Sequence, residues 1–429
     1  MPQTHDRIEA PRSSRLRRYL RRLVVAFLVA LAIGVTLPFG CVGNRQFNTD
    51  PADYLRRFST EDGLPYSVAV VEFDDQGEPW DLGQLDAAVA EIRRLNESAS
   101  HGIILYQFVH GWKSNASRDE ASGQRLAWFE ERVSSIARGS YALTESSGED
   151  PRPVMGLYIG WRGRTYSLPI LIDASFWNRR VAAHRVASKR LNEVLFRTAN
   201  AAKVNPESKC VLVGHSMGGM IVEKTLGPAI VSDIMMAEYG GRPVSLPYDL
   251  IVLANASTEA LHSKQMVDIF RRTSVRTMLQ YGDGRLTPAR GPMLVSATSE
   301  LDDVTRYMVP IAMTFNSLFV RYRSSHDNAV PSQRDLGIRT AGYVPFLHSH
   351  TVEVESDRVV IREIPDRWND TPFWIFQVPS AVSADHSDID GPLWADLMLQ
   401  LMQANRVFDP DVALYLVDDT KATDAMEAE

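Results

Sequence analysis

The chain has 429 residues, of which 45% are hydrophobic and 23% are charged, a composition typical of a folded globular protein. Its formal net charge is −7 at pH 7, and no stretch interleaves basic with aromatic residues, which argues against nucleic acid as a partner. The only two cysteines are Cys41 and Cys210, which excludes a disulfide framework and a cysteine-based zinc site.

The amino-terminal segment, residues 1–41, is predicted to be an export signal or a membrane anchor. Several arginines precede the uncharged run from Leu23 to Phe39, whose 17 residues are at the short limit for crossing a bilayer. The arginines are expected to stay in the cytoplasm, so that everything after Cys41 lies outside it. Gly40-Cys41 resembles a bacterial lipoprotein cleavage site, although the two preceding residues depart from its usual pattern. A lipidated Cys41, an uncleaved anchor and a simple secreted protein are three open alternatives.

The following part of the chain is predicted to alternate strands with helices. Residues 42–65 are polar and are expected to form a tether, after which apolar runs of strand length recur. The predicted strands are Val68–Phe73, Ile103–Val109, Val154–Trp161, Cys210–Val213, Asp249–Ala254, Pro292–Ala297 and Pro372–Val378. The predicted helices include Leu85–Leu95, Asp119–Ala137, Ala174–Ala201, Ser263–Arg272 and Leu393–Met402. This alternation indicates an α/β fold with a mostly parallel central sheet and helices on both faces.

One stretch interrupts the alternation. Residues 318–365 contain the runs Leu347–Val354 and Arg358–Ile364, which look like an exposed hairpin inserted before the last strand, or a cap. We therefore expect one domain over residues 66–410, with an insertion at about 318–365 and an acidic tail over 411–429.

The stretch from Lys209 to Leu226 is predicted to place a nucleophilic serine, Ser216, between a strand and a helix. A serine in such a turn has a strained backbone, and glycines two residues before and after it, here Gly214 and Gly218, avoid collisions between Cβ atoms. The N–H groups at the start of the helix point at an incoming oxyanion. A chance Gly-x-Ser-x-Gly is the competing interpretation, and the flanking strand and helix argue against it.

Loops at the carboxyl ends of the other strands supply further candidates, because reactive groups collect at that edge of a parallel sheet. His110-Gly111-Trp112 follows the strand that ends at Val109, and Gly111 lets the chain approach a substrate carbonyl closely. The backbone N–H groups of Trp112 and Met217 are predicted to form an oxyanion hole.

A general base is expected among the ten histidines. His386 is the preferred candidate, because it follows the last predicted strand and precedes the last predicted helix. His348 and His350 lie in the insertion and stay in consideration, since a cap can lean over a site. His215, next to the serine, is expected to point elsewhere.

The carboxylate that orients the base is expected after the strand Pro292–Ala297. Glu300, Asp302 and Asp303 are available there, and Asp302 is preferred, with Asp303 second and Glu300 third. A carboxylate that is not used in this way is expected to cap the following helix.

Four short sequences together resemble the α/β-hydrolase superfamily of esterases and lipases, in particular bacterial envelope hydrolases. They are Val109 to Trp112, Gly214 to Gly219, Ser299 to Asp302 and Asp385 to Ile389. The resemblance spans about residues 66–406 and implies an α/β-hydrolase fold with a serine-hydrolase mechanism. In that mechanism Ser216 attacks an acyl carbon, His386 transfers the proton and Asp302 orients His386. The segment Tyr158–Gly163 shares the resemblance without a chemical role.

No metal or organic cofactor is implied, and no His-Glu-x-x-His motif is present. The acidic residues Asp385, Asp388 and Asp390 are a weak candidate for calcium, and a solvated loop is the favoured interpretation.

The first functional hypothesis is a membrane-anchored serine hydrolase of the cell envelope that cleaves carboxylic esters of small molecules or lipids. It would be lipase-like if the insertion forms an apolar lid. A peptidase, thioesterase or acyltransferase uses the same residues, and the fold does not choose among them. The third hypothesis is a membrane-tethered binding protein on an inactive hydrolase fold. The presence of all three catalytic residue types in the required order argues against it.

Overall fold

The structure is a computed structural model that describes residues 22, 24, 25 and 43–408. Within the last range it leaves out 62, 119–123, 148–150, 166–172, 174, 242–243, 274–277, 281–285, 289–290, 324–329 and 366–370. The lipidation candidate Cys41, nearly all of the predicted membrane segment and the predicted acidic tail 411–429 lie outside the described residues. Among the helices formed by described residues, none is long and apolar enough to cross a membrane.

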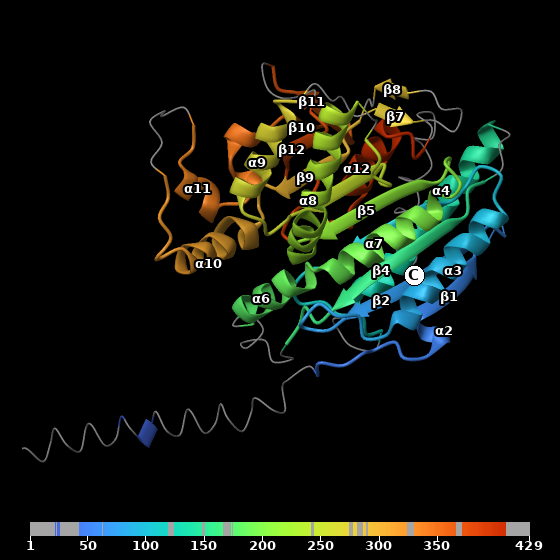
Figure 1. Cartoon of the computed structure of the whole chain (residues 1–429), viewed down its shortest axis with the longest axis horizontal. Coiled ribbons are helices and arrows are strands. Elements are labelled where there is room, and N and C mark those ends of the chain that lie inside the picture. The colour runs from blue at the N-terminus through green and yellow to red at the C-terminus, as the bar shows by residue number, and fades with distance from the viewer. Residues whose placement is uncertain are drawn as a thin grey trace, which may run out of the picture.

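An eight-stranded sheet forms the centre of the molecule (Figure 1). Its strands are β1 (Leu55–Ser59), β2 (Pro65–Phe73), β3 (Ile104–Val109), β4 (Val154–Trp161), β5 (Lys209–His215), β6 (Leu250–Ala254), β9 (Leu294–Ser299) and β12 (Phe373–Val378). They lie in the order β1-β2-β4-β3-β5-β6-β9-β12, and every neighbouring pair is parallel except β1 with β2. The predicted α/β fold with a mostly parallel sheet is confirmed.

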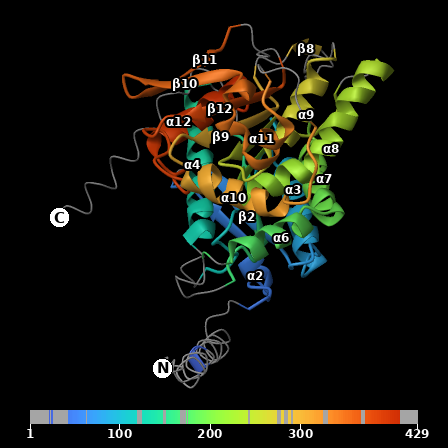
Figure 2. The ribbon, with the colours of Figure 1, turned by 90° about the vertical axis from the view of Figure 1, so that its left-hand side faces the viewer.

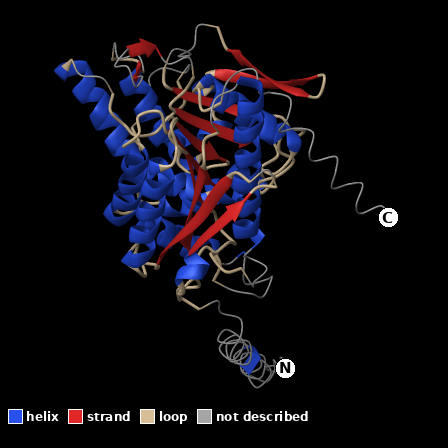
Figure 3. Cartoon of the chain, turned by 90° about the vertical axis from the view of Figure 1, so that its right-hand side faces the viewer, coloured by secondary structure: helices blue, strands red, loops and turns tan. Residues whose placement is uncertain are grey.

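Helices cover both faces of this sheet (Figure 3). The core on one face includes side chains of α3 (Leu82–Glu97), α6 (Phe176–Val186), α7 (Lys189–Ala202), α8 (Met217–Gly240) and α9 (Ala260–Phe270). The core on the other face includes side chains of α4 (Gln124–Ser147) and α12 (Pro392–Ala404). Because both faces of each central strand are buried, these strands are apolar along most of their length, which is why the sequence located them.

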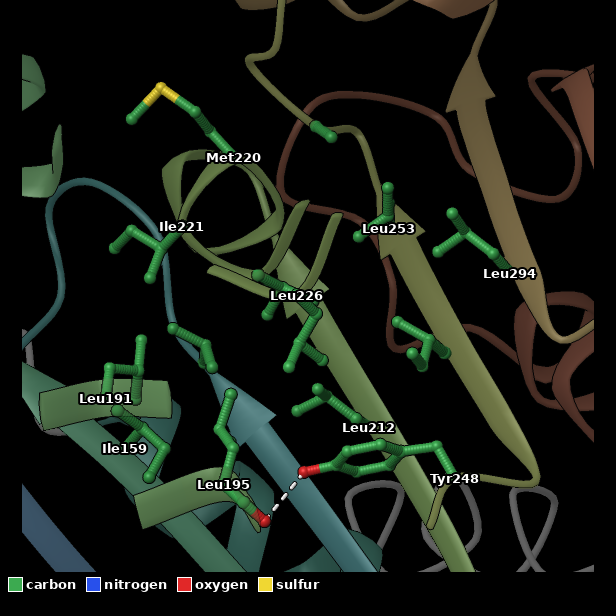
Figure 4. Close-up of a cluster of buried hydrophobic side chains, with 14 of the residues drawn as sticks. Ile159, Leu191, Leu195, Leu212, Met220, Ile221, Leu226, Tyr248, Leu253 and Leu294 are labelled. Carbon is green, nitrogen blue, oxygen red and sulfur yellow. Dashed lines mark hydrogen bonds between the residues drawn. The ribbon is translucent and has the colours of Figure 1, made fainter. Parts of the chain in front are cut away.

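The core on the first face joins β5 to the helices that flank it (Figure 4). Leu191 and Leu195 of α7, Ile221 of α8 and Leu212 of β5 are fully buried there. The hydroxyl of Tyr248, just before β6, donates a hydrogen bond to the carbonyl oxygen of Leu195 at 3.0 Å. This packing fixes the direction in which β5 delivers the residue at its carboxyl end.

The segment predicted to be a tether, residues 42–65, is largely part of the fold. It contains the short helix α2 (Pro51–Tyr54), and β1 pairs with β2. Asn48 is buried, and its side-chain amide donates to the carboxylate of Glu72 at 3.0 Å and to the carbonyl oxygen of Ala116 at 2.9 Å. The prediction is therefore wrong from about Asn48 onwards, because polar residues that suggested a solvated linker have buried partners.

The single helix predicted over Ala174–Ala201 is two helices, α6 and α7. Ser188, between them, has an extended backbone, and its hydroxyl accepts a hydrogen bond from the N–H of Leu191 at 3.3 Å. A serine in this conformation caps the start of a new helix. The sequence prediction was wrong here because the apolar periodicity continues across the break.

The smaller elements lie around the second half of the chain. They are β7 (Met278–Gln280), β8 (Leu286–Pro288), the π-helical turn η2 (Val304–Met308), α10 (Val309–Asn316), α11 (Gln333–Ile338), the 3₁₀ turns η3 (Ala341–Tyr343) and η4 (Pro345–Leu347), β10 (His350–Glu355) and β11 (Arg358–Glu363).

The predicted hairpin exists, because β10 and β11 pair antiparallel, but it is not a free cap. Val352 and Val359 are buried in the same core as α12, and the N–H of Val359 donates to the carboxylate of Asp396 in α12 at 2.7 Å. The hairpin therefore packs onto the second face of the molecule. The expectation that the whole hairpin is exposed is wrong, because only its outer side, which includes Thr351, Glu353 and Arg362, is exposed.

Candidate active site

Ser216 stands between β5 and α8 in a backbone conformation that few residues adopt. Its φ is 59° and its ψ is −122°, and a positive φ is strained for a residue other than glycine. A Cβ atom on Gly218 would lie 2.0 Å from the carbonyl oxygen of Val109, so only glycine lets α8 begin this close to β3. The strand, turn and helix predicted around Ser216 are present.

His386 and Asp302 reach Ser216 from two other loops. His386 lies between β12 and α12, and Asp302 follows β9. The Nε2 atom of His386 is 2.7 Å from Oγ of Ser216, and its Nδ1 atom is 2.8 Å from Oδ1 of Asp302. The side chain of His386 is 13% exposed, whereas that of Asp302 is fully buried. The structure thus brings together the three side chains that the sequence singled out.

The three carboxylates that follow β9 have different surroundings. Asp302 is buried and accepts hydrogen bonds from the N–H and the hydroxyl of Thr305 as well as from His386. Asp303 is exposed and begins η2 without a side-chain cap. Glu300 accepts the N–H of Ser380 at 2.8 Å. Of the three, Asp302 is the one in contact with an imidazole.

The main chain of His386 is held by two side chains for which the sequence analysis predicted no such role. Nε2 of His215 donates to the carbonyl oxygen of His386 at 2.8 Å, and the side-chain amide of Asn255 donates to the same oxygen at 2.9 Å. Burial lowers the pKa of His215 well below its usual value, which keeps the ring neutral with its proton on Nε2. Asn255 also accepts the N–H of Ser299 at 2.8 Å. These contacts join the loops after β5, β6, β9 and β12.

The loop after β3 lies directly against Ser216. A Cβ atom on Gly111 would be 2.6 Å from Cβ of Ser216 and 3.1 Å from its Oγ. The indole N–H of Trp112 donates to the hydroxyl of Ser175 at 3.1 Å. In the part of the chain that the structure describes, the backbone N–H groups of Trp112 and Met217 have no protein acceptor. Both amides are therefore available to a negatively charged oxygen.

The segment Tyr158–Gly163, for which the sequence suggested no role, supports this loop. His110 accepts the N–H of Trp161 on Nε2 at 3.0 Å, and its Nδ1 donates to the carbonyl oxygen of Gly111 at 2.9 Å. The two rings stack with centroids 5.5 Å apart. Burial lowers the pKa of His110 to about 4, so the ring stays neutral and can both donate and accept. The contact with Gly111 fixes the peptide that carries the N–H of Trp112.

The insertion contributes one residue to this region. The hydroxyl of Tyr343 donates to the carbonyl oxygens of Ser299 at 2.8 Å and of Asp302 at 3.1 Å. Gly342 lies against Thr298, whose side chain would be 2.3 Å from a Cβ atom at residue 342. The turn η3 therefore braces the main chain that carries Asp302.

The other histidines considered as bases are engaged elsewhere. Nε2 of His348 lies 2.9 Å from the carbonyl oxygen of Gly342. His350 is buried, with its Nδ1 atom 2.8 Å from the hydroxyl of Ser349 and its ring tilted by 32° against that of Trp374. Neither ring contacts Ser216.

The acidic residues considered for calcium organise the loop that carries His386. The carboxylate of Asp385 accepts the N–H groups of Ser387 and Asp388, and Asp390 pairs with Arg125 at 3.0 Å. No group of three or more potential ligands suited to a metal ion occurs among the residues described.

A cavity of about 250 Å³ lies between α4 and α12, apart from the candidate site. Aromatic and apolar side chains such as Trp128, Trp394 and Met398 line it. None of the three candidate catalytic side chains does so, and we assign it no part in the chemistry.

No protein-family model matches the chain, and no curated protein matches its sequence. The solved structures with weak similarity to the chain include two of one phospholipase. Phospholipase PlaB from Legionella pneumophila in complex with thio-NAD is 13% identical, with a TM-score of 0.32, over 74% of this chain and 62% of that one. A second structure of phospholipase PlaB from Legionella pneumophila is 12% identical, with a TM-score of 0.30, over 74% of this chain and 63% of that one. The chain spans less than two thirds of either protein, and similarity at this level assigns neither a family nor an activity to it.

Proposed function

We propose that the chain is a serine hydrolase of the α/β-hydrolase superfamily that cleaves carboxylic esters through an acyl-enzyme. The observation that supports this proposal is the continuous hydrogen-bonded path from Asp302 through both ring nitrogens of His386 to Oγ of Ser216. The strained turn at Ser216 supports the same proposal, as do the two nearby amides, which have no protein acceptor among the described residues.

Acylation begins when Oγ of Ser216 attacks the acyl carbon of the ester and Nε2 of His386 takes the hydroxyl proton. Asp302 accepts a hydrogen bond from Nδ1 and so keeps the ring in the tautomer that can receive this proton. The N–H groups of Trp112 and Met217 donate to the developing oxyanion. When the bond to the alcohol breaks, Nε2 returns the proton to the departing oxygen.

Deacylation repeats these steps with water. His386 takes a proton from the water molecule, whose oxygen attacks the acyl carbon of the ester formed on Ser216. The same two amides stabilise the second oxyanion. The bond to Oγ then breaks, Nε2 protonates Oγ, and the carboxylic acid leaves.

Hydrolysis of p-nitrophenyl esters of increasing acyl length by the full chain tests this proposal. We expect release of p-nitrophenol by the native protein and a loss of at least about 10⁴-fold in kcat/KM in Ser216→Ala. The Ser59→Ala variant, which changes an exposed serine at the end of β1, outside the proposed triad, serves as the matched control. Esters left intact while peptides are cleaved would contradict the ester specificity, and inactivity towards both would favour a non-catalytic binding protein.

We also propose that the amino-terminal segment holds the hydrolase domain at the cell envelope, outside the cytoplasm. The arginines and the apolar run from Leu23 to Phe39 support this location. If Cys41 is lipidated, cells given radioactive palmitate will label the native chain and leave Cys41→Ser unlabelled. If the native chain is unlabelled, lipidation is refuted, and an uncleaved anchor and ordinary secretion are the two remaining alternatives.

A further inference from the structure

Helices α6 and α10 lie side by side (Figures 1 and 2). These helices, the turn η2 and the segment that follows α10 expose a group of apolar side chains. We call this group the apolar stripe. It consists of Trp177, Val181, Tyr307, Ile311, Phe315, Leu318, Phe319 and Val320. Their exposed fractions range from 42% for Trp177 to 98% for Phe319, and the rings of Trp177 and Phe315 are perpendicular, with centroids 6.2 Å apart. The stripe therefore continues from one helix to the other.

The stripe is not the outer side of ordinary amphipathic helices. Tyr307, Ile311 and Phe315 recur at intervals of four residues, which places them on one helical face. The opposite face of α10 is also apolar, because Val309 and Met313 are buried in the core. A surface helix normally turns a polar face to water, so an apolar outer face indicates a partner that is itself apolar.

Basic residues surround the stripe. Arg185 follows Val181 by one turn of α6, the guanidinium of Arg306 lies 5.2 Å from the ring centre of Tyr307, and Arg321 and Arg323 follow Val320. All four arginines are exposed. The exposed acids next to the stripe in sequence are Asp173, Glu300 and Asp303. Asp173 pairs with Lys113 at 2.9 Å, and Glu300 accepts the N–H of Ser380. Aromatic and aliphatic side chains with a rim of arginines match a lipid surface, whose phosphates lie above its acyl chains.

The stripe lies close to the candidate active site. The turn η2 begins two residues after Asp302, and Thr305 in that turn donates to Asp302. The arrowheads of β2 and β5 point towards the side of the molecule where α6 and α10 lie (Figure 1). A surface that contacts the stripe therefore faces the same edge of the sheet as Ser216.

The amino-terminal end of the domain also enters at this edge. Asn48 binds the carbonyl oxygen of Ala116, which belongs to the loop that follows β3 and contains Gly111. Asn48 lies only seven positions after Cys41, so the chain from one to the other spans at most about 25 Å. An anchor that ends near Cys41 would hold the carboxyl edge of the sheet within this distance of a bilayer.

We propose that the apolar stripe docks on a lipid bilayer, with its aromatic and aliphatic side chains at the boundary between headgroups and acyl chains. Its arginines would lie against the lipid phosphates, and the candidate site would face ester groups of membrane lipids. The choice of lipid esters as substrates rests on the proposed hydrolase function. The proposal that the stripe docks on a bilayer does not rest on the hydrolase function.

Photo-crosslinking tests the docking without reference to catalysis. The full chain carrying Ser216→Ala is reconstituted in vesicles of phosphatidylcholine and phosphatidylglycerol, with benzoylphenylalanine in place of Phe319. A second chain carries the probe in place of Val204, which is 76% exposed at the opposite edge of the sheet, before β5. We expect lipid adducts by mass spectrometry at residue 319 in at least about tenfold excess over residue 204. Equal adducts at both positions, or adducts between two protein chains at residue 319, would overturn the proposal.

Kinetics test the link to substrate. Ile311→Glu combined with Phe319→Glu is expected to reduce hydrolysis of vesicle lipids at least about tenfold and to leave hydrolysis of a water-soluble p-nitrophenyl ester within about twofold. Val204→Glu combined with Tyr239→Glu, two exposed positions remote from the stripe, is the matched control and should change neither rate. An unchanged rate on vesicles, or an equal loss on both substrates, would refute a docking role. If the native chain hydrolyses neither substrate while residue 319 still crosslinks to lipid, the hydrolase proposal fails and the docking surface stands.

Discussion

The two edges of the central sheet use buried polar groups in different ways. At the amino edge, the carboxylate of Asp249 accepts hydrogen bonds from the ammonium group of Lys203 and from the N–H of Cys210, both at 2.7 Å. The charge of Asp249 and the backbone amide of Cys210 therefore both have a partner nearby. At the carboxyl edge, the path from Asp302 through His386 ends at a hydroxyl on a strained backbone, beside amides that have no protein acceptor in the described chain. Strain and unused donors thus distinguish the edge suited to chemistry from the edge that only stabilises the fold.

The largest expected effect is that of Asp302→Asn at the carboxyl edge. The amide would hold the ring of His386 in the wrong tautomer, so we expect kcat on a p-nitrophenyl ester to fall by about 10⁴-fold with little change in melting temperature. Asp303→Asn, which alters the exposed neighbouring carboxylate, is the control and should retain activity. Similar losses in both variants would show that Asp302 has no special part.

Gly111→Ala is expected to have the next largest effect. The new Cβ atom would approach Cβ of Ser216 to 2.6 Å, which displaces the loop that carries the N–H of Trp112. Loss of one oxyanion donor corresponds to about 10²–10³-fold in kcat. Gly240→Ala, where a Cβ atom meets nothing within 4 Å, is the control. Steady-state kinetics of both variants check the prediction, and an undiminished kcat in Gly111→Ala would remove this loop from the oxyanion hole.

A pH-dependent loss of stability is expected from His110. Its pKa is about 4 in the folded chain and 6.5 as the ordinary value, so the unfolded state binds the proton more readily between these pH values. The stabilisation is complete above about pH 6.5 and is lost as the pH falls towards 4, which amounts to about 3 kcal/mol. Urea unfolding at pH 7 and pH 4 should show the native chain losing that much more free energy than His110→Gln. Parallel losses in the two chains would contradict the assignment.

At the amino edge, Asp249→Asn should change stability and leave catalysis alone. Removing the carboxylate leaves Lys203 the carbonyl oxygen of Ser208 but no negative charge, and it weakens the contact to Cys210. We expect a cost of about 2 kcal/mol in the free energy of unfolding. kcat measured well below the melting temperature should stay within about twofold of the native value. A large loss of kcat would erase the distinction between the two edges.

The sequence could locate the elements whose signals are local. The seven predicted strands correspond to β2, β3, β4, β5, β6, β9 and β12, because strands buried on both faces are continuous apolar runs. The turn around Ser216 was predictable because its conformation requires glycine at nearby positions. The order of the strands predicted candidates in the loops after β9 and β12, from which Asp302 and His386 extend towards Ser216.

Features that depend on distant contacts could not be read in this way. Asp302 and Asp303 are neighbours with the same side chain, and only the path of the main chain after β9 buries one and exposes the other. The strand β1 is short and polar, and it pairs with β2. Its Arg57 forms an ion pair with the buried carboxylate of Glu91, which is 34 positions away in the sequence. The contact of His110 with Trp161 joins residues that are 51 positions apart, so no local pattern announced it.

Labelling of the full chain with a fluorophosphonate, followed by peptide mass spectrometry, tests the proposed catalytic role of Ser216 most directly. The account predicts one adduct per chain on Ser216, slower labelling in Asp302→Asn and no adduct in Ser216→Ala. A folded native chain that takes up no label, or takes it up at another residue, would contradict the proposal.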